Sequence, residues 1–287
     1  MNTVKFIVAL ATFKREELLK RALNSVSQQD YPNIEVIVVD DSGEKPEKKF
    51  VDDNLGDKLH YFYHDANLGV NQARNTLVKK AKELDPSAYM VFIDDDDYLT
   101  DGALSIAAKA IKEHPEFVWF TMDCSHPDGK KISKLNHYGK LSYLDDYMFG
   151  KDLRGDMLHI VKTDAIGDAR YSDQFKNGEI WYFWCQLSIR NPLYAIQATG
   201  CVKEFLDEGI TKTGYNRDRI INVLEYKIAT LEPIVGFKKL RHQYITLAKH
   251  LLKGQRKQEA KVLLKNVFKQ SPGYTRQYKH WIKYFLS

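Results

Sequence analysis

Residues 89–97 read YMVFIDDDD, a mainly apolar run that leads directly into four consecutive aspartates. An apolar run of this length, bounded by polar residues, is typical of a strand that is covered on both faces. Four adjacent carboxylates repel one another and raise one another's pKa values unless a cation or hydrogen-bond donors compensate. The stretch therefore predicts a buried strand that ends at a charged site.

Further apolar runs at residues 4–10 (VKFIVAL) and 34–40 (IEVIVVD) also predict buried strands, and residues 59–63 (LHYFY) suggest a shorter one. Apolar side chains recur with helical spacing between the first two runs and again over residues 70–84. Strands that alternate with helices of about ten to fifteen residues are typical of parallel βαβ units. The first hundred residues therefore predict a nucleotide-binding type of α/β fold, and the chain beyond about residue 215 has a helical pattern.

Two acidic clusters directly follow predicted strands: Asp40 with Asp41, and residues 94–97. In open α/β sheets, ligands bind outside the carboxyl ends of the strands. Solvated turn residues are one interpretation of these acids. The other is a site for Mg²⁺ or Mn²⁺, which bind one or two carboxylates and complete their ligand shell with phosphate oxygens and water. Because four carboxylates adjoin at one strand end, we favour a metal–diphosphate site.

Glycine-rich phosphate-binding motifs are missing from the sequence. No GxGxxG follows the first predicted strand, and GxxxxGK[ST] does not occur. The sequence thus gives poor support to a dinucleotide-binding or P-loop enzyme. A sugar-nucleotide-forming nucleotidyltransferase would share the fold and the metal, but it usually has a GxGTR-like loop where this chain has ALATFKR.

Three blocks occur in order: TFKREELLKRALNSVSQQDYPNIEVIVVDDSG at 12–43, NLGVNQARNTLVKKA at 67–81 and YMVFIDDDDYL at 89–99. In this order they resemble the inverting glycosyltransferase family 2, whose members have the GT-A fold. The resemblance covers roughly the first 105 residues. It implies a nucleotide-diphospho-sugar transferase with a Rossmann-like mixed sheet flanked by helices.

The resemblance implies roles for four residues in binding the nucleotide. Ala11 and Phe13 match the loop after the first strand, which touches the base in the family. Asp41 matches the acid that pairs with the base edge, usually uracil. Arg74 matches the basic residue of the ARN block, near the phosphates, and its place in the first turns of a predicted helix favours phosphate binding.

The DxD motif of the family matches Asp94 and Asp96, with Asp96 as the expected direct metal ligand and Asp94 as the second. Asp95, between them, is expected near the ribose. The cofactor implied is Mn²⁺ or Mg²⁺, with a UDP-sugar as the donor.

A general base must remove the proton of the acceptor hydroxyl as its oxygen attacks the anomeric carbon. In the family this base is an acid in a later ED-like segment before an aromatic-rich helix. Glu179, in NGEIWYFWCQL, matches that segment, although Ile180 replaces the second acid. Asp173 and Asp168 are the alternatives. A glutamate that only stabilises a helix start remains the structural interpretation.

We therefore expect a GT-A catalytic domain over residues 1–230, with a nucleotide-sugar-binding half at 1–105 and an acceptor-side half at 106–230. Residues 231–287 are expected to form a basic helical extension. The expected function is metal-dependent transfer of a sugar, with inversion, to a glycan or lipid-linked acceptor in cell-surface polysaccharide or glycoconjugate synthesis. A noncatalytic carbohydrate- or membrane-binding protein that kept the fold is the alternative.

Charge is distributed unevenly along the chain. Residues 236–287 contain 13 Lys and Arg and one acid, Glu259, whereas the other 235 residues contain 30 bases and 37 acids. An amphipathic basic element suits an anionic membrane surface, and a helical cap on the catalytic domain is the alternative. No motif accompanies the charge, so we expect no nucleic-acid partner.

Three widely spaced cysteines indicate a reducing compartment. The apolar run near the N-terminus is too short for a signal peptide and is followed by charged residues. No window reaches the roughly 20 apolar residues of a membrane span. We expect a cytoplasmic protein that can also associate with the inner face of the membrane.

Overall fold

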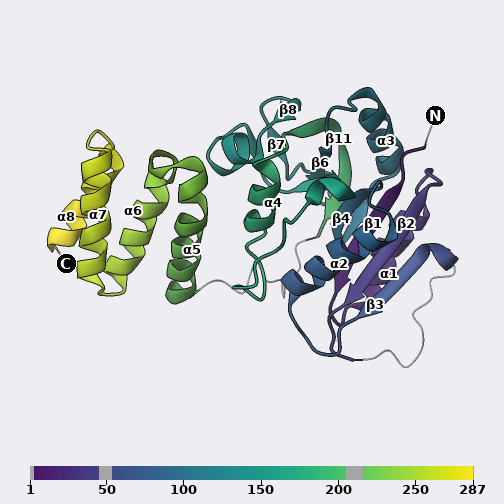
Figure 1. The fold of residues 1–287 in the computed structure, drawn as a ribbon, viewed down its shortest axis with the longest axis horizontal. Coiled ribbons are helices and arrows are strands. Elements are labelled where there is room, and N and C mark those ends of the chain that lie inside the picture. The colour runs from purple at the N-terminus through teal and green to yellow at the C-terminus, as the bar shows by residue number, and fades with distance from the viewer. Residues whose placement is uncertain (1–2, 45–53, 205–215, 287) are drawn as a thin grey trace. The chain divides into compact units, whose positions relative to one another are not determined.

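The computed structural model describes residues 3–44, 54–204 and 216–286, and the chain divides into two compact units, Met1–Gly209 and Ile210–Ser287 (Figure 1). The first unit contains a mixed sheet flanked by helices, and the second contains helices in its described part. The mixed α/β architecture and the helical C-terminal region expected from the sequence are thereby confirmed. The first unit ends at Gly209, so helix α5 belongs to the second unit. The boundary expected at residue 230 falls inside this helix.

The sheet of the first unit has the strand order β3-β2-β1-β4-β10-β6-β11-β5, with β8 paired to β11. Its strands are β1 (Phe6–Thr12), β2 (Ile34–Asp40), β3 (Leu59–Tyr63), β4 (Tyr89–Asp94), β5 (Asp97–Leu99), β6 (Trp119–Ser125), β8 (Gly139–Leu141), β10 (Met157–Lys162) and β11 (Leu193–Lys203). Strands β7 (Lys134–Leu135) and β9 (Leu153–Arg154) form a separate pair. The first four strands are parallel to one another, whereas β10 runs antiparallel to both β4 and β6.

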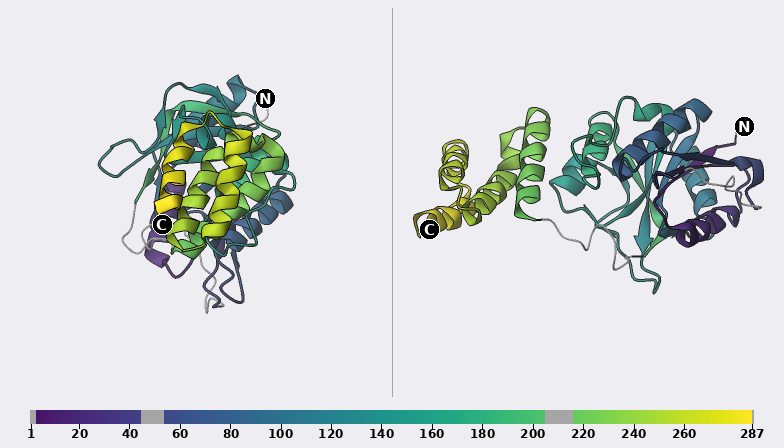
Figure 2. Two further views of the ribbon diagram at one scale, coloured as in Figure 1. Left: turned by 90° about the vertical axis from the view of Figure 1, so that its left-hand side faces the viewer. Right: turned by 90° about the horizontal axis from the view of Figure 1, so that it is seen from below.

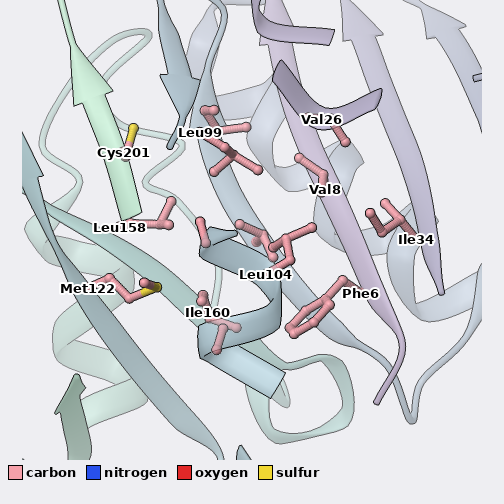
Figure 3. Packing of buried hydrophobic residues seen from close by; sticks show 14 of the residues in the cluster. Phe6, Val8, Val26, Ile34, Leu99, Leu104, Met122, Leu158, Ile160 and Cys201 are labelled. Atoms are coloured by element: carbon pink, nitrogen blue, oxygen red, sulfur yellow. The ribbon is translucent and has the colours of Figure 1, made fainter. Parts of the chain in front are cut away.

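Helices α1 (Glu16–Ser27) and α3 (Ala103–Glu113) cover one face of the sheet, and α2 (Val70–Leu84) and α4 (Trp181–Ser188) cover the other. On the first face, Phe6, Val8 and Ile160 lie around Leu104 of α3 in a continuous apolar core (Figure 3). On the second face, Phe92 of β4 contacts the rings of Phe183 and Trp184. Because alternate residues of a strand point to opposite faces, the continuous apolar runs of the sequence fill both layers.

The second unit consists of α5 (Arg217–Val235), α6 (Phe237–Lys253), α7 (Lys257–Gln270) and α8 (Tyr278–Leu286), which lie alongside one another (Figure 2). Each of the first three helices buries an apolar stripe, for example Leu240, Leu247 and Leu251 of α6. Short single-turn elements complete the described structure: η1 (Gly56–Lys58), the π-helical η2 (Tyr143–Met148), η3 (Thr163–Ile166) and η4 (Thr275–Gln277). Within the described ranges, no helix has the length and apolar character needed to cross a bilayer.

The topology brings several strand ends to one edge of the sheet. Thr12, the last residue of β1, lies opposite Asp40 of β2, and Ala11 lies opposite Asp94 of β4. Strand β6 has the same direction as β4, since both are antiparallel to β10. The carboxyl ends of β1, β2, β4 and β6 therefore share the edge at which ligands bind in such sheets.

Candidate active site

Three aspartates of the predicted cluster converge where β4 ends and β5 begins. One carboxylate oxygen from each of Asp94, Asp96 and Asp97 lies within 4.8 Å of the others. The side chains of Asp94 and Asp96 are 40% and 22% exposed, whereas that of Asp97 is almost completely buried. Asp94 and Asp96 thus have oxygens available to a ligand, as the hard cations Mg²⁺ and Mn²⁺ require.

Four basic side chains, from α1 and its N-terminal residue, α2 and β11, surround these acids. Arg74 Nη2 lies 2.5 Å from Asp94 Oδ1, and Lys203 Nζ lies 2.5 Å from Asp97 and 3.7 Å from Asp94. The guanidinium of Arg15 bridges the next two acids, at 3.2 Å from Asp95 and 3.1 Å from Asp96. In addition, Arg21 donates to the backbone carbonyl oxygen of Asp96 at 2.6 Å.

Arg15 and Lys203 are site residues to which the sequence motifs assign no role. Arg15 stands inside the first block, TFKRE, so its position next to a predicted loop was a usable signal. Lys203 had no such signal, because it reaches Asp97 only through the pairing of β11 with β5, in which these two residues lie opposite each other.

The acids of the cluster differ in pKa. Burial opposes ionisation of Asp94, but Arg74 and Lys203 outweigh burial and hold its pKa below the ordinary value. Burial raises the pKa of Asp95 to about 6, despite the hydrogen bond from Thr12 at 2.8 Å. It also raises the pKa of Asp96, which the charge of Asp94 raises further. Burial thus disfavours the ionised forms of Asp95 and Asp96, and a divalent ion bound beside them would favour those forms.

Asp41 is buried at the end of β2, and both of its carboxylate oxygens accept hydrogen bonds from the chain itself. Oδ1 accepts from His64 Nδ1 at 2.8 Å and from the Leu68 backbone at 2.9 Å, and Oδ2 accepts from the Gly69 backbone at 2.7 Å. Asp41 thus fixes the turn that starts helix α2. Its predicted contact with the base edge would use the remaining acceptor capacity of Oδ2.

The other residues predicted to touch the base lie at the end of β1. Ala11 lies opposite Asp94 in the sheet, and Phe13 follows the last residue of the strand. The ring of Phe13 is 44% exposed. It is therefore accessible at this edge, and its contact with the base stays a prediction.

Glu179 lies just before α4 and has a left-handed backbone, with φ of 56°. Such a conformation is uncommon for a residue other than glycine, and retained strain of this kind is concentrated at functional sites. Its Oε2 accepts a hydrogen bond from Trp181 Nε1 at 2.7 Å. The indole therefore orients one side of the carboxylate. Trp184 belongs to the core, where it stacks on Trp119.

The alternative acids, Asp168 and Asp173, line a groove of about 860 Å³ beside α2. Gln72 and Lys79 of α2 also line this groove, and Gln72 donates to Asp173 at 2.8 Å. Glu179 is not among the residues that line this groove. The choice of Glu179 over these two acids stays a prediction.

The loop that leads to Glu179 is held against α2 by side-chain amides. Asn71 Nδ2 donates to the carbonyl oxygen of Phe175 at 2.8 Å. Asn75 exchanges two hydrogen bonds with the backbone of Tyr171, at 2.7 and 3.2 Å. Helix α2 thus connects Arg74, at the acid cluster, with the segment that precedes the predicted base.

Comparison with known proteins gives a consistent result. The sequence model described as glycosyl transferase family 2 matches residues 7–181. A Campylobacter jejuni GalNAc(5)-diNAcBac-PP-undecaprenol beta-1,3-glucosyltransferase is 27% identical over 219 residues, which are 72% of this chain and 67% of the relative. The putative colanic acid biosynthesis glycosyl transferase WcaA of Escherichia coli is 34% identical over 107 residues, 37% of each chain.

Among solved structures, residues 1–349 of Staphylococcus aureus TarS in complex with UDP-GlcNAc match with a TM-score of 0.63 and 18% identity. The match covers 98% of this chain and 79% of the TarS chain, and at this identity it establishes the shared GT-A fold. By sequence, TarS is 31% identical over 116 residues, which are 39% of this chain and 19% of TarS. Since the family model spans more than half of the residues, the chain belongs to glycosyl transferase family 2 and is a glycosyltransferase.

Proposed function

We propose that this glycosyltransferase transfers a sugar from a UDP-linked donor to a glycan or lipid-linked acceptor, with inversion at the anomeric carbon and with a divalent metal. The observation that carries the proposal is the convergence of Asp94 and Asp96 beside Arg74 at the carboxyl edge of the sheet. Two names support the substrate classes: one relative acts on a PP-undecaprenol-linked glycan, and TarS was crystallised with UDP-GlcNAc.

The donor would lie across this edge, with its base near Phe13 and Asp41 and its diphosphate at the acid cluster. Asp96 and Asp94 would hold Mn²⁺ or Mg²⁺, and a bound ion supplies screening of the diphosphate and stabilisation of the leaving group. Arg74, one to two turns into α2, adds a fixed positive charge on the same side. Asp95, which Thr12 and Arg15 hold at this edge, remains the candidate for the ribose.

Glu179 would act as the general base. Its carboxylate accepts the proton of the acceptor hydroxyl as that oxygen forms a bond to the anomeric carbon and the bond to the diphosphate breaks. The proton remains on Glu179, and the negative charge leaves with UDP. The hydrogen bond from Trp181 holds one carboxylate oxygen, so the other is the candidate proton acceptor.

The proposal is tested by incubating the purified chain with UDP-glucose, UDP-galactose, UDP-GlcNAc and UDP-GalNAc and measuring release of UDP. Release is expected with Mn²⁺ or Mg²⁺, and it should be lost in excess EDTA and in an Asp96→Asn variant. Asp128→Asn, an exposed acid outside the cluster, is the control and should behave as the parent. Full activity in EDTA would refute the metal role, and no binding of UDP by the parent would refute the donor assignment.

We further propose that the C-terminal extension contacts an anionic membrane surface at the inner face of the cytoplasmic membrane. Helix α7 combines the exposed apolar side chains of Val262 (65%) and Phe268 (46%) with the exposed Lys265 and Lys269. Basic charge beside exposed apolar groups suits a surface of anionic lipid headgroups. The 13-to-1 excess of basic over acidic residues in 236–287 agrees with this partner.

Co-sedimentation with vesicles tests this contact. The parent should bind vesicles that contain phosphatidylglycerol and should be released by 0.5 M salt, since Debye screening weakens such attraction. A Lys265→Glu, Lys269→Glu variant should lose the binding, whereas Lys109→Glu, an exposed position on α3, should keep it. Equal binding by all three proteins would count against the proposal.

A further inference from the structure

Strand β6 carries a buried carboxylate that the predicted mechanism does not use. The side chain of Asp123 is 1% exposed, and its Oδ2 accepts hydrogen bonds from Lys131 Nζ at 2.7 Å and Tyr138 Oη at 2.8 Å. Its Oδ1 has no hydrogen-bond partner among the residues that the structure describes. The hydroxyl of Thr121, two residues earlier, is also buried and has no partner within the same ranges.

Unpartnered buried polar atoms are rare in folded proteins, because each has lost its hydrogen bonds to water without replacement. Two such atoms on one face of one strand therefore indicate a place for a further hydrogen-bonding group. A carboxylate with one free oxygen accepts hydrogen bonds, and the adjacent ammonium of Lys131 has donors to spare. This combination of acceptor and donor matches neighbouring hydroxyl groups.

Asp123 lies on the same face of the sheet as Asp94. Phe120, Met122 and Cys124 belong to the core on the other face, so Asp123 points toward the side of α4. In the sheet register His159 lies opposite both Phe92 and Thr121, which places these three residues in one row. Asp94 and Asp123, each two residues further toward the carboxyl edge, fall in the next row at a separation of about 10 Å, or two strand spacings.

The order of the strands matches the order of the parts of a nucleotide sugar. Asp41 on β2 and Phe13 after β1 mark the predicted base site, and β4 carries the acids for the diphosphate. The sheet continues from β4 through β10 to β6. The transferred sugar, attached to the diphosphate at the end away from the nucleoside, would extend in this direction. Asp123 is the buried acid at the edge that the sugar would reach.

From this placement we propose that Asp123, with Lys131 and Tyr138, binds hydroxyl groups of the transferred sugar. The proposal rests on the proposed function and adds a specificity-determining site to it. Lys131 forms part of the cover of Asp123, and its side chain is 57% exposed on a flexible four-carbon stem. Displacement of this side chain opens Asp123 to a sugar hydroxyl. A trapped water is the alternative partner for Oδ1.

Calorimetric titration with UDP and with a UDP-sugar, each in the presence of Mn²⁺, separates these possibilities. The sugar nucleotide is the one of the four named above that the parent binds most tightly. For Asp123→Asn we expect unchanged affinity for UDP and an affinity for the UDP-sugar that is about 10- to 100-fold weaker, as for loss of a hydrogen bond to a charged group. Asp128→Asn, on the same loop as Lys131, should change neither value.

Equal affinities of parent and Asp123→Asn for the UDP-sugar would overturn the proposal in favour of a trapped water. So would an equal loss for UDP and UDP-sugar, which would indicate general damage to the site. If thermal melting shows that Asp123→Asn does not fold, Lys131→Met and Tyr138→Phe take its place, and a UDP-sugar affinity within twofold of the parent in both would overturn the proposal. Failure of the parent itself to bind UDP would instead refute the proposed function.

Discussion

Arg74 Nη2 donates to Asp94 Oδ1 at 2.5 Å, and this contact joins helix α2 to the end of strand β4. The guanidinium also lies over the ring of Tyr171, with 5.5 Å between Cζ and the ring centroid. Tyr171 in turn stacks on Phe183 of α4. The basic residue of the ARN block is therefore fixed in direction before any diphosphate binds, which lowers the entropy that binding would cost.

Removing this guanidinium should affect both stability and nucleotide binding. In Arg74→Ala, the basic partner left to Asp94 among the described residues is Lys203, at 3.7 Å, so we expect the free energy of unfolding to fall by about 1–3 kcal/mol. UDP affinity should fall at least tenfold. Urea unfolding and calorimetry measure the two effects. Lys79→Ala, an exposed position on the same helix, should leave both unchanged. UDP affinity within twofold of the parent in Arg74→Ala would exclude a role in phosphate binding.

Gly69 is required at the start of α2 for two separable reasons. Its φ is 93°, and a Cβ at this position would collide with the side chain and carbonyl of Lys176. We expect Gly69→Ala to lower the free energy of unfolding by about 3 kcal/mol, from the left-handed backbone and the clash together. Gly102→Ala is the comparison, because Gly102 lies in the αL region (φ 69°, ψ 7°) and has open space around its Cβ position, whereas Gly69, with ψ of 158°, has a conformation open essentially to glycine alone. It should cost only about 1 kcal/mol, and equal losses would show that both the backbone strain and the clash at residue 69 are relieved.

The predicted base can be tested against its alternatives. Glu179→Gln keeps the shape and the contact with Trp181 but cannot accept a proton, so kcat should fall by about 10²- to 10⁴-fold. UDP affinity should remain within twofold of the parent. Asp173→Asn and Asp168→Asn, on the groove beside α2, should retain near-normal kcat. A large loss in either of these with normal turnover in Glu179→Gln would reassign the base.

His159 makes the stability of the protein depend on pH. Burial lowers the pKa of this imidazole to about 3 from the model-peptide value of 6.5, and its Nδ1 accepts a hydrogen bond from Trp119 Nε1 at 3.1 Å. The folded state binds fewer protons than the unfolded state below pH 6.5. Above pH 6.5 this group therefore does not change the free energy of unfolding. As the pH falls below 6.5, the free energy of unfolding decreases, by about 2 kcal/mol at pH 5.

Urea unfolding of the parent and of His159→Gln at pH 7.5, 6 and 5 measures this pH dependence of the free energy of unfolding. The free energy of unfolding of the parent should fall toward that of the variant as the pH decreases. A difference between the two proteins that stays constant with pH would mean that His159 is protonated in the folded state or accessible to water.

The strand and the helix nearest the site were predicted correctly, because the sequence patterns that indicate them lie within a few neighbouring residues. The residues of β4 and the acids that follow it are contiguous, so the apolar run and its terminus were visible together. The helical stripe of α2 was also visible, because the buried Ala73, Leu77 and Ala81 recur with the helical period. Between residues 123 and 178 the pattern was weak, since β7, β8 and β9 have only two or three residues each.

The amino-acid sequence by itself determined the alternation of strands and helices along the first hundred residues, the acids after β4 and the basic residue of α2, because each depends on neighbours a few positions away. Only the tertiary structure decided that Lys203 pairs with Asp97, that Asp41 holds the start of α2, and that Asp123 shares a face and an edge with Asp94. These relationships depend on strand order and register, which hydrogen bonding between distant segments fixes and which no local pattern records.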